Sequence, residues 1–125
     1  MTGATLDSGA LIAFERGGVR MLALVERAMR HGVRLAVPAG VVAQTWREGA
    51  RQARLSRLLR APLAEIVPLD DLTARAVGVL CDRARTADVI DVSVVVCARQ
   101  RGHRVVSDDA DDLRAIDPTL AVVSP

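Results

Sequence analysis

The stretch 86–113 constrains the fold of this chain most, because it places carboxylates at both ends of a long apolar run. Asp88 and Asp91 stand three residues apart before the apolar run 92–98. A short strand-like segment, 103–106, then leads into a cluster of aspartates: Asp108, Asp109, Asp111 and Asp112. Carboxylates at the start of a buried helix and others at the end of a strand can converge on one point. Oxygen ligands gathered in this way suit a divalent cation.

The apolar run after Asp91 is open to two interpretations of secondary structure. The segment 92–96 is rich in β-branched valines, which favour a strand. The run from Asp88 to Arg101 is long for a strand, however, and its basic end before Gly102 is typical of a helix C terminus. We therefore predict a helix whose first turn projects Asp88 and Asp91 from one face. Either aspartate could instead cap or decorate that turn, although an unpaired carboxylate among apolar neighbours is costly at Asp91.

Asp7 is the candidate for a further ligand from a distant part of the chain. It ends a short strand expected over 3–7 and is soon followed by residues typical of a helix start, 10–14. A strand that turns directly into a helix places its last side chain at the carboxyl edge of a parallel sheet, where α/β domains bind ligands. The alternative role for Asp7 is a helix N-cap, for which Ser8 competes.

Strands alternate with helices along the whole chain. Helices are expected at 19–31, 39–60 with a break at Gly49, 70–85, 88–101 and 111–116, and strands at 3–7, 34–37, 65–67, 103–106 and 120–123. This order predicts an α/β fold with a parallel sheet covered on both faces. A chain of 125 residues suits one domain, 1–125, with one sizeable core. Because hydrophobic residues make up 50% and aromatic residues only 2%, that core would consist of Ala, Val and Leu.

Composition excludes several classes of function. The formal net charge of +2 is too small to argue by itself for nucleic-acid binding. All 17 basic residues are arginine, which excludes any mechanism that needs a lysine. Cys81 and Cys97 lack metal or redox spacing and are expected to be buried thiols in a reducing compartment. Because no signal peptide or membrane-length apolar run is present, we expect a soluble, cytoplasmic protein with no membrane contact.

Arginines recur every three or four residues in the segment 47–60 and would form one stripe on a helix. The stripe is interpreted either as a solvated face or as a phosphate-binding ridge. Its members are Arg47, Arg51, Arg54, Arg57 and Arg60. Trp46, the only tryptophan, is expected in the core rather than as a base-stacking platform.

Four segments together resemble the PIN-domain family, and within it the VapC-like ribonuclease toxins of type II toxin–antitoxin systems. They are LDSGALIA at 6–13, AQTWREGARQARLSRLL at 43–59, the stretch 86–113 and the final strand. The resemblance spans essentially the whole chain, and its specificity comes from the conjunction of several short acidic motifs. It implies a PIN-like α/β/α sandwich around a central parallel sheet of four or five strands. It also implies an acidic pocket that binds Mg²⁺ or Mn²⁺ and hydrolyses single-stranded or loop RNA.

The resemblance assigns roles to individual acids of the first and third segments. Asp7 matches the first aspartate of the family. Asp91 matches the aspartate of a D-A motif, in which Val92 here replaces the alanine. Asp88 is an additional acid found in one branch of the family. The same resemblance implies a cognate antitoxin that covers the acidic pocket, and frequent homodimerisation.

The segment 105–113, VVSDDADDL, lines up with the family pattern V-V-T-S-D-x-x-D-L. This alignment puts Ser107 at the threonine position, Asp109 at the metal-side aspartate and Asp112 at the acid before the leucine. The metal ligands that the resemblance implies are therefore Asp7, Asp91 and Asp109.

One position departs from the family pattern A-E-x-x-x-G, in which a glutamate lies near the start of the helix after the second strand. Gln44 stands where that glutamate is expected. Glu48, four residues on, would lie one turn along the same helix face and could replace it as a catalytic carboxylate. With Asp88 and Asp112, it would orient the attacking water or a second ion. The alternative role for Glu48 is a surface ion pair with Arg51.

Other classes of function compete with the metal-dependent nuclease. A phosphoacceptor receiver domain also places aspartates at strand ends, but it would need a lysine, and the chain has none. A haloacid-dehalogenase-type phosphatase would need a second aspartate two residues after Asp7, where Gly9 stands. A catalytically impaired PIN module that acts only through protein or RNA binding stays open, and Gln44 favours it.

Overall fold

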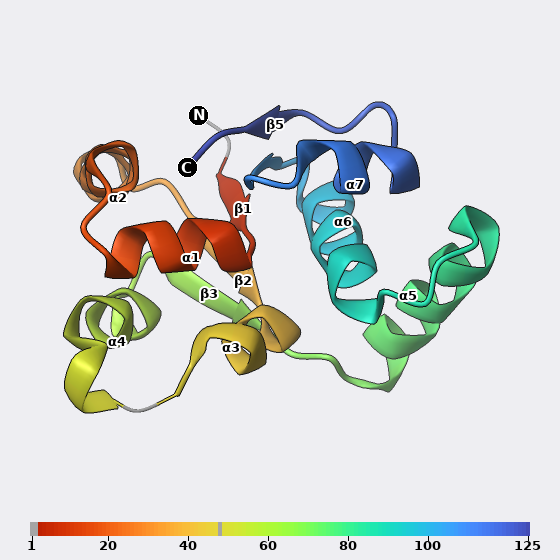
Figure 1. The fold of residues 1–125 in the computed structure, drawn as a ribbon, viewed down its shortest axis with the longest axis horizontal. Coiled ribbons are helices and arrows are strands. Elements are labelled where there is room, and N and C mark those ends of the chain that lie inside the picture. The colour runs from red at the N-terminus through yellow and green to blue at the C-terminus, as the bar shows by residue number, and fades with distance from the viewer. Residues whose placement is uncertain (1–2, 48) are drawn as a thin grey trace.

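A five-stranded parallel sheet forms the centre of the molecule (Figure 1). The computed structural model describes residues 3–47 and 49–125. The strands lie in the order β3-β2-β1-β4-β5, and every neighbouring pair is parallel. Their bounds are β1 Ala4–Leu6, β2 Leu35–Pro38, β3 Ala64–Val67, β4 Arg104–Val106 and β5 Val122–Val123. The predicted α/β fold with a parallel sheet of four or five strands is therefore confirmed.

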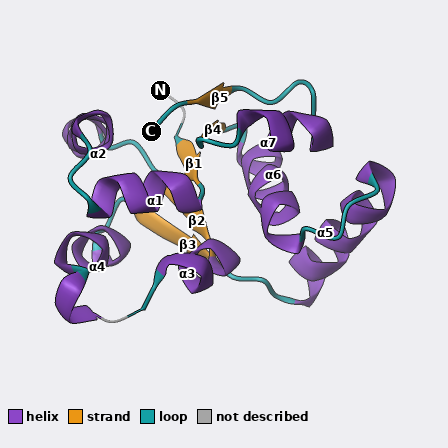
Figure 2. Ribbon diagram, viewed as in Figure 1, coloured by secondary structure: helices purple, strands orange, loops and turns teal. Residues whose placement is uncertain are grey.

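Helices connect every pair of consecutive strands and cover both faces of the sheet (Figure 2). One layer contains α1, which contacts α2, α3 and α4, and the other contains α6, which packs on β1, β2 and β4 beneath α5 and α7. The bounds are α1 Ser8–Glu15, α2 Val19–His31, α3 Ala39–Thr45, α4 Ala53–Arg60, α5 Asp71–Ala84, α6 Val89–Arg101 and α7 Ala110–Ile116, with one 3₁₀ turn, η1, at Gly49–Arg51. No described helix has the length and apolar character needed to span a bilayer.

The valine-rich segment is a helix, as predicted, and tertiary burial explains why. In α6 the seven consecutive residues 92–98 are all buried, so apolar side chains are needed on every side of the helix. A helix enclosed by a sheet and two other helices accepts β-branched residues, because packing outweighs their modest helix propensity. Gly102 ends the helix in the left-handed conformation, with φ of 66°.

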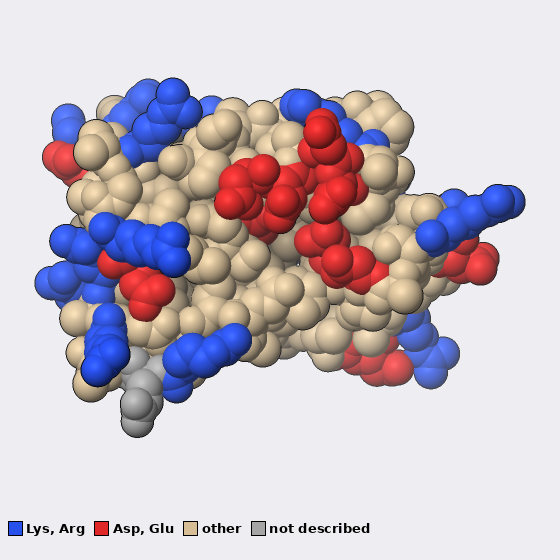
Figure 3. Space-filling view, in the orientation of Figure 1, with Lys and Arg blue, Asp and Glu red and all other residues tan. Residues whose placement is uncertain are grey.

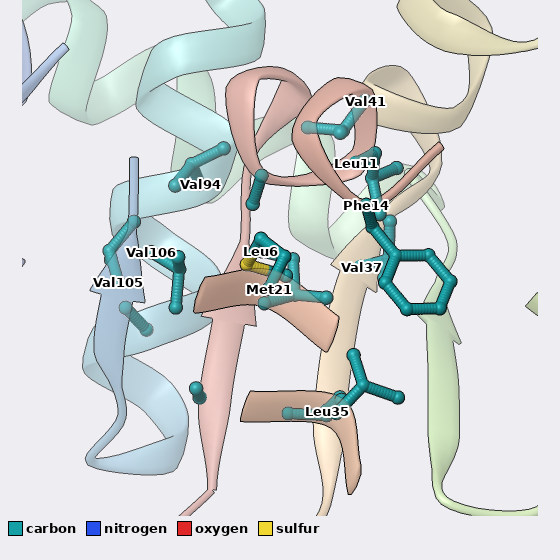
Figure 4. Packing of buried hydrophobic residues seen from close by; sticks show 14 of the residues in the cluster. Leu6, Leu11, Phe14, Met21, Leu35, Val37, Val41, Val94, Val105 and Val106 are labelled. Atoms are coloured by element: carbon teal, nitrogen blue, oxygen red, sulfur yellow. The ribbon is translucent and has the colours of Figure 1, made fainter. Parts of the chain in front are cut away.

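The strands alternate their side chains between the two layers. Leu6, Leu35 and Val37 point toward α1 and α2, where they meet Leu11 and Met21 (Figure 4). On the opposite side of the sheet, intervening residues face α6. Ala36 packs with Val67 and Cys97 there, and the Thr5 hydroxyl lies 3.5 Å from the Cys97 thiol. The main core is therefore aliphatic, as the composition predicted.

The predicted break in the helix over 39–60 is confirmed, and Gly49 lies within it, but the break extends over several residues. The first helix ends earlier, at Thr45, and the second begins at Ala53. The buried side chain of Gln52 stabilises this break, because its Nε2 donates to the Thr45 carbonyl at 2.8 Å and its Oε1 accepts from the Arg47 backbone N–H at 2.9 Å. A side chain that satisfies backbone groups on both sides of a gap replaces the helical hydrogen bonds lost there.

Two other predictions for this region are wrong, because the helix is interrupted between Thr45 and Ala53. The five arginines do not form one stripe, because they are divided between the segment after α3, the 3₁₀ turn and α4. Trp46 is not a core residue, since it stands at the extended C-cap of α3 and is 37% exposed.

Candidate functional site

The carboxyl ends of β1 and β4 meet at the point where the strand order reverses. The chain leaves β1 for β2 on one side and reaches β4 on the other, and such a point is where open α/β sheets bind ligands. Leu6 is in register with Val106, and the Asp7 backbone N–H donates to the Val106 carbonyl at 3.2 Å. Asp7 and the acidic segment after β4 are therefore neighbours, although about 100 residues separate them in sequence.

Asp7 is both an N-cap and a member of the acidic cluster. Its Oδ1 accepts the backbone N–H of Ala10 at 3.3 Å, so the capping role considered from the sequence is real. The residue is only 3% exposed. Burial raises the pKa of its carboxyl above the ordinary value, and the Asp108 charge adds to this, while a hydrogen bond from Ser107 opposes it.

Three aspartates at the edge of the sheet form a possible metal site. One carboxylate oxygen each from Asp7, Asp108 and Asp109 lies within 4.8 Å of the other two. An all-oxygen set at this spacing, with two members exposed to retained waters, fits Mg²⁺ or Mn²⁺. Gly9 leaves room for this arrangement, since a Cβ there would collide with the Asp108 carboxylate.

Asp108 is the member of this group that sequence reasoning missed. It belongs to the acidic cluster after β4, but the family pattern has a serine at its position, so the alignment assigned it no role. The acidic cluster was a signal, yet the distance to Asp7 depends on how β1 pairs with β4. Only the tertiary structure shows which of the aspartates faces Asp7.

Asp91 joins the cluster from the first turn of α6, although it is outside the set of three. It is half-buried, and its pKa is raised to about 6 by burial, then by the charges of Asp88, Asp109 and Asp112. Burial and the charges of Asp108, Asp112 and Asp88 likewise raise the pKa of Asp109. These negative charges repel one another, so the acids at the start of α6 interact electrostatically with the acids after β4.

Asp88 caps α6, as the simpler interpretation of its position proposed. Its Oδ1 accepts the backbone N–H of Asp91 at 3.0 Å, while its own N–H donates to the Thr86 hydroxyl at 3.1 Å. The two carboxyl groups are close enough for the Asp88 charge to raise the pKa of Asp91. Roles for Asp88, Asp91, Asp109 and Asp112 in catalysis stay predictions.

The position that departs from the family pattern gains no support from the helix geometry. Gln44 is exposed on α3, and α3 ends at Thr45, so the helical spacing on which the substitution by Glu48 relied does not extend that far. Glu48 itself lies outside the described residues. Its proposed role as a catalytic carboxylate or as a partner of Arg51 therefore stays a prediction.

Among the described residues, no arginine forms an ion pair with the acidic cluster. Figure 3 shows acidic side chains gathered in one patch on this face, with basic side chains bordering the upper end of the patch. The ion pairs formed by described residues join arginines to acids elsewhere: Arg30–Glu26, Arg75–Asp71, Arg99–Asp117 and Arg101–Glu65. Uncompensated carboxylates that raise one another's pKa are stabilised by a bound cation.

Three solved structures share this fold. A chain of VapBC2 from Rickettsia felis, bound to a DNA fragment from their promoter, matches with a TM-score of 0.71 at 14% identity, over 99% of this chain and 98% of that one. FitAB bound to an IR36 DNA fragment matches with a TM-score of 0.63 at 18% identity, over 98% and 94%. FitAcB from Neisseria gonorrhoeae matches with a TM-score of 0.63 at 21% identity, over 95% of each chain.

Comparison of the sequence alone finds no such relatives: no family model and no curated protein matches this chain. The structural likeness shows that this chain shares its fold with chains of the VapBC2, FitAB and FitAcB structures, which agrees with the fold expected from the acidic motifs. At 14–21% identity the likeness concerns the fold and not the activity.

Proposed function

We propose that this protein is a metal-dependent endoribonuclease and the toxin of a toxin–antitoxin pair, acting in the cytoplasm. The observation that carries the proposal is the meeting of Asp7 with Asp108 and Asp109 within 4.8 Å, with no ion pair from a described arginine. Clustering carboxylates in this way is costly unless a cation is bound. The shared fold of the toxin-like structures supports the nuclease over other metal-dependent functions.

The carboxylates are proposed to have two roles, binding the metal ion and orienting the attacking water. Asp7, held by the start of α1, and Asp109 would hold the ion, with Asp108 as a third oxygen donor. Asp91 is the fourth proposed ligand, directly or through a retained water, because its charge interacts with that of Asp109. A bound Mg²⁺ or Mn²⁺ would polarise the scissile phosphate and lower the pKa of a water. Orientation of that water is the role proposed for Asp88, Asp112 and Glu48.

Cleavage of RNA tests the proposal directly. The protein incubated with structured RNA and Mn²⁺ should cleave it, and EDTA should stop the reaction. Asp7→Asn and Asp109→Asn should each slow cleavage by at least about 100-fold, because each removes an ion ligand. Asp71→Asn, which removes an exposed acid from α5, is the matched control and should cleave at the parent rate. Parent-like cleavage by Asp109→Asn would contradict the proposed site.

A second candidate function is a catalytically impaired PIN module that acts through protein or RNA binding. The exposed Gln44 at the expected glutamate position favours it. In that case the RNA would be retained by the protein without cleavage in Mg²⁺ or in Mn²⁺. The same assay, with bound and cleaved RNA measured separately, distinguishes the two functions.

The partners that we propose are an RNA substrate, a cognate antitoxin and a second copy of the chain. The antitoxin would cover the acidic patch, so its addition should inhibit cleavage. Support comes from the shared fold with VapBC2 and FitAB, which are two-component assemblies by name. Co-purification with the product of a neighbouring gene, followed by a measurement of molar mass in solution, tests both protein partners.

A further inference from the structure

A groove at the amino-terminal edge of the sheet gathers three arginines. Arg20 and Arg27 come from α2, and Arg104 begins β4. Small and aliphatic residues make the floor, and the groove has a volume of about 230 Å³. The floor residues include Gly3, Ala4, Leu24, Ala28 and Leu35. No role in the proposed metal chemistry involves any of them.

Local geometry explains why the arginines converge. Arg20 and Arg27 are seven residues apart, or about two helical turns, so they share a face of α2 with Leu24 between them. Arg104 is in register with Ala4 on the neighbouring strand, so both side chains leave the sheet on the same side. That side is the one covered by α2, since Ala4 belongs to the core cluster with Met21.

The charge of the groove is not compensated within the described part of the chain. None of the three arginines donates a hydrogen bond or makes an ion pair to a described residue, and no described acid lines the groove. By contrast Arg30, three residues after Arg27 on the same helix, pairs with Glu26 at 2.9 Å. Three exposed guanidinium groups around an apolar floor repel one another, and together they attract an anion.

We propose that this groove binds phosphate groups of the single-stranded RNA that reaches the acidic cluster, an inference that rests on the proposed function. β4 carries Arg104 at one end and leads to Asp108 four residues later, a span of about 13 Å along an extended strand. Arginines also gather over α2 on the face that shows the acidic patch (Figure 3). A flexible strand held at the groove could therefore lie across the carboxylates.

The chemistry of the groove identifies phosphate as the group recognised. The arginines supply the charged donors, and guanidinium binds phosphate oxygens through paired hydrogen bonds. The floor has no aromatic side chain for base stacking, and its aliphatic side chains offer no hydrogen bonds to base edges. The contact should therefore strengthen RNA binding without selecting a sequence.

Binding of a short fluorescent oligouridine, measured by anisotropy in EDTA over a series of salt concentrations, tests the proposal. The double variant Arg27→Gln/Arg104→Gln keeps much of each side chain and removes two charges. It should bind at least about fivefold more weakly at low salt, and its slope of log affinity against log salt should fall by about 1.4, or 0.7 for each phosphate contact. Circular dichroism would establish that the variant is folded.

The matched control is Arg75→Gln/Arg83→Gln on α5, which makes the same change in net charge away from the groove. Its affinity should change less than twofold. Equal losses in both double variants would reveal only a general charge effect and would overturn the proposal. Parent-like RNA binding by the groove variant, or a loss limited to antitoxin binding, would also overturn it, as would a parent protein that binds no oligouridine.

Cleavage in Mn²⁺, measured in parallel, separates this inference from the proposed function. If the parent cleaves RNA and the groove variant binds RNA normally, the proposed phosphate site is wrong, and the proposed nuclease activity is supported. If the parent cleaves no RNA but the groove variant loses affinity for the oligouridine, the proposed hydrolytic function is wrong, and the proposed phosphate site is supported.

Discussion

At the scale of single residues, Asp91 shows how burial and neighbouring charges change one carboxyl group. Its pKa is raised from 3.8 to about 6, chiefly by burial. The folded protein therefore binds this proton more tightly than the unfolded chain does. Between about pH 4 and pH 6 the folded state carries the extra proton, so this group makes the free energy of unfolding fall as pH rises.

Asp91→Asn should consequently stabilise the protein when no divalent ion is bound. In EDTA at pH 8 the free energy of unfolding should rise by on the order of 1 kcal/mol, a value reduced for solvent screening because the group is half-exposed. The melting temperature would increase by a few degrees. The gain should disappear near pH 4, where the parent carboxyl is protonated as well. Thermal unfolding at the two pH values checks this, and an equal gain at both would contradict it.

A second single-residue prediction concerns Gly9→Ala, which should weaken ion binding without lowering the free energy of unfolding. The added methyl group meets the Asp108 carboxylate, which can move aside because it ends a side chain. Helix propensity favours alanine over glycine by up to about 1 kcal/mol, so the protein should not lose stability. Displacing Asp108 should nevertheless weaken Mn²⁺ binding about tenfold, measured as the rise in melting temperature with added ion.

The control for this experiment is Gly78→Ala on α5, where an added Cβ meets nothing within 4 Å. It should gain the same helix propensity and keep parent-like Mn²⁺ binding. An unchanged Mn²⁺ response in Gly9→Ala would show that Asp108 is not part of the ion site.

At the scale of secondary structure elements, one ion pair joins the edge strand β3 to the buried helix α6. Arg101 donates from Nε and Nη2 to the two Glu65 carboxylate oxygens, at 3.0 and 3.1 Å. This hydrogen bond lowers the pKa of Glu65 below its ordinary value of 4.5. The pair is therefore fully present above that value and is lost as pH falls through the lowered pKa.

Glu65→Gln should reduce the free energy of unfolding by about 0.5–1 kcal/mol at pH 7, since the pair is bidentate but partly exposed. The difference from the parent should shrink as the pH approaches 3. Urea unfolding at several pH values measures this. Asp71→Asn breaks a fully surface pair with Arg75 and serves as the comparison, with little expected change. A difference that persists at low pH would assign the effect to packing instead.

Element boundaries show where prediction from the sequence succeeded and where it could not. The helix α6 was predictable because its length, its basic last turn and Gly102 are local signals. The break at Gly49 was predictable as well, but its extent from 46 to 52 was not, because it depends on Gln52 reaching back to the Thr45 carbonyl. Glycine is a local signal for a break, whereas a hydrogen bond from a side chain seven residues away is not.

At the scale of the whole molecule, topology creates the candidate site. Because β1 lies between β2 and β4, the chain leaves it in one direction and returns on the other side. Asp7, directly after β1, and the aspartates after β4 then share one edge of the sheet. Both strands are labelled in Figure 2. The arginine groove lies at the opposite edge of the same two strands. One pair of neighbouring strands thus connects the two regions of opposite charge.

The sequence by itself determined the elements, their parallel arrangement and the gathering of acids after two strands, because periodicity and capping act between residues close in the chain. Only the tertiary structure decided that Asp108 lies within 4.8 Å of Asp7 and Asp109. The physical reason is that the register of β1 with β4 sets distances between segments about 100 residues apart. No local pattern contains that information.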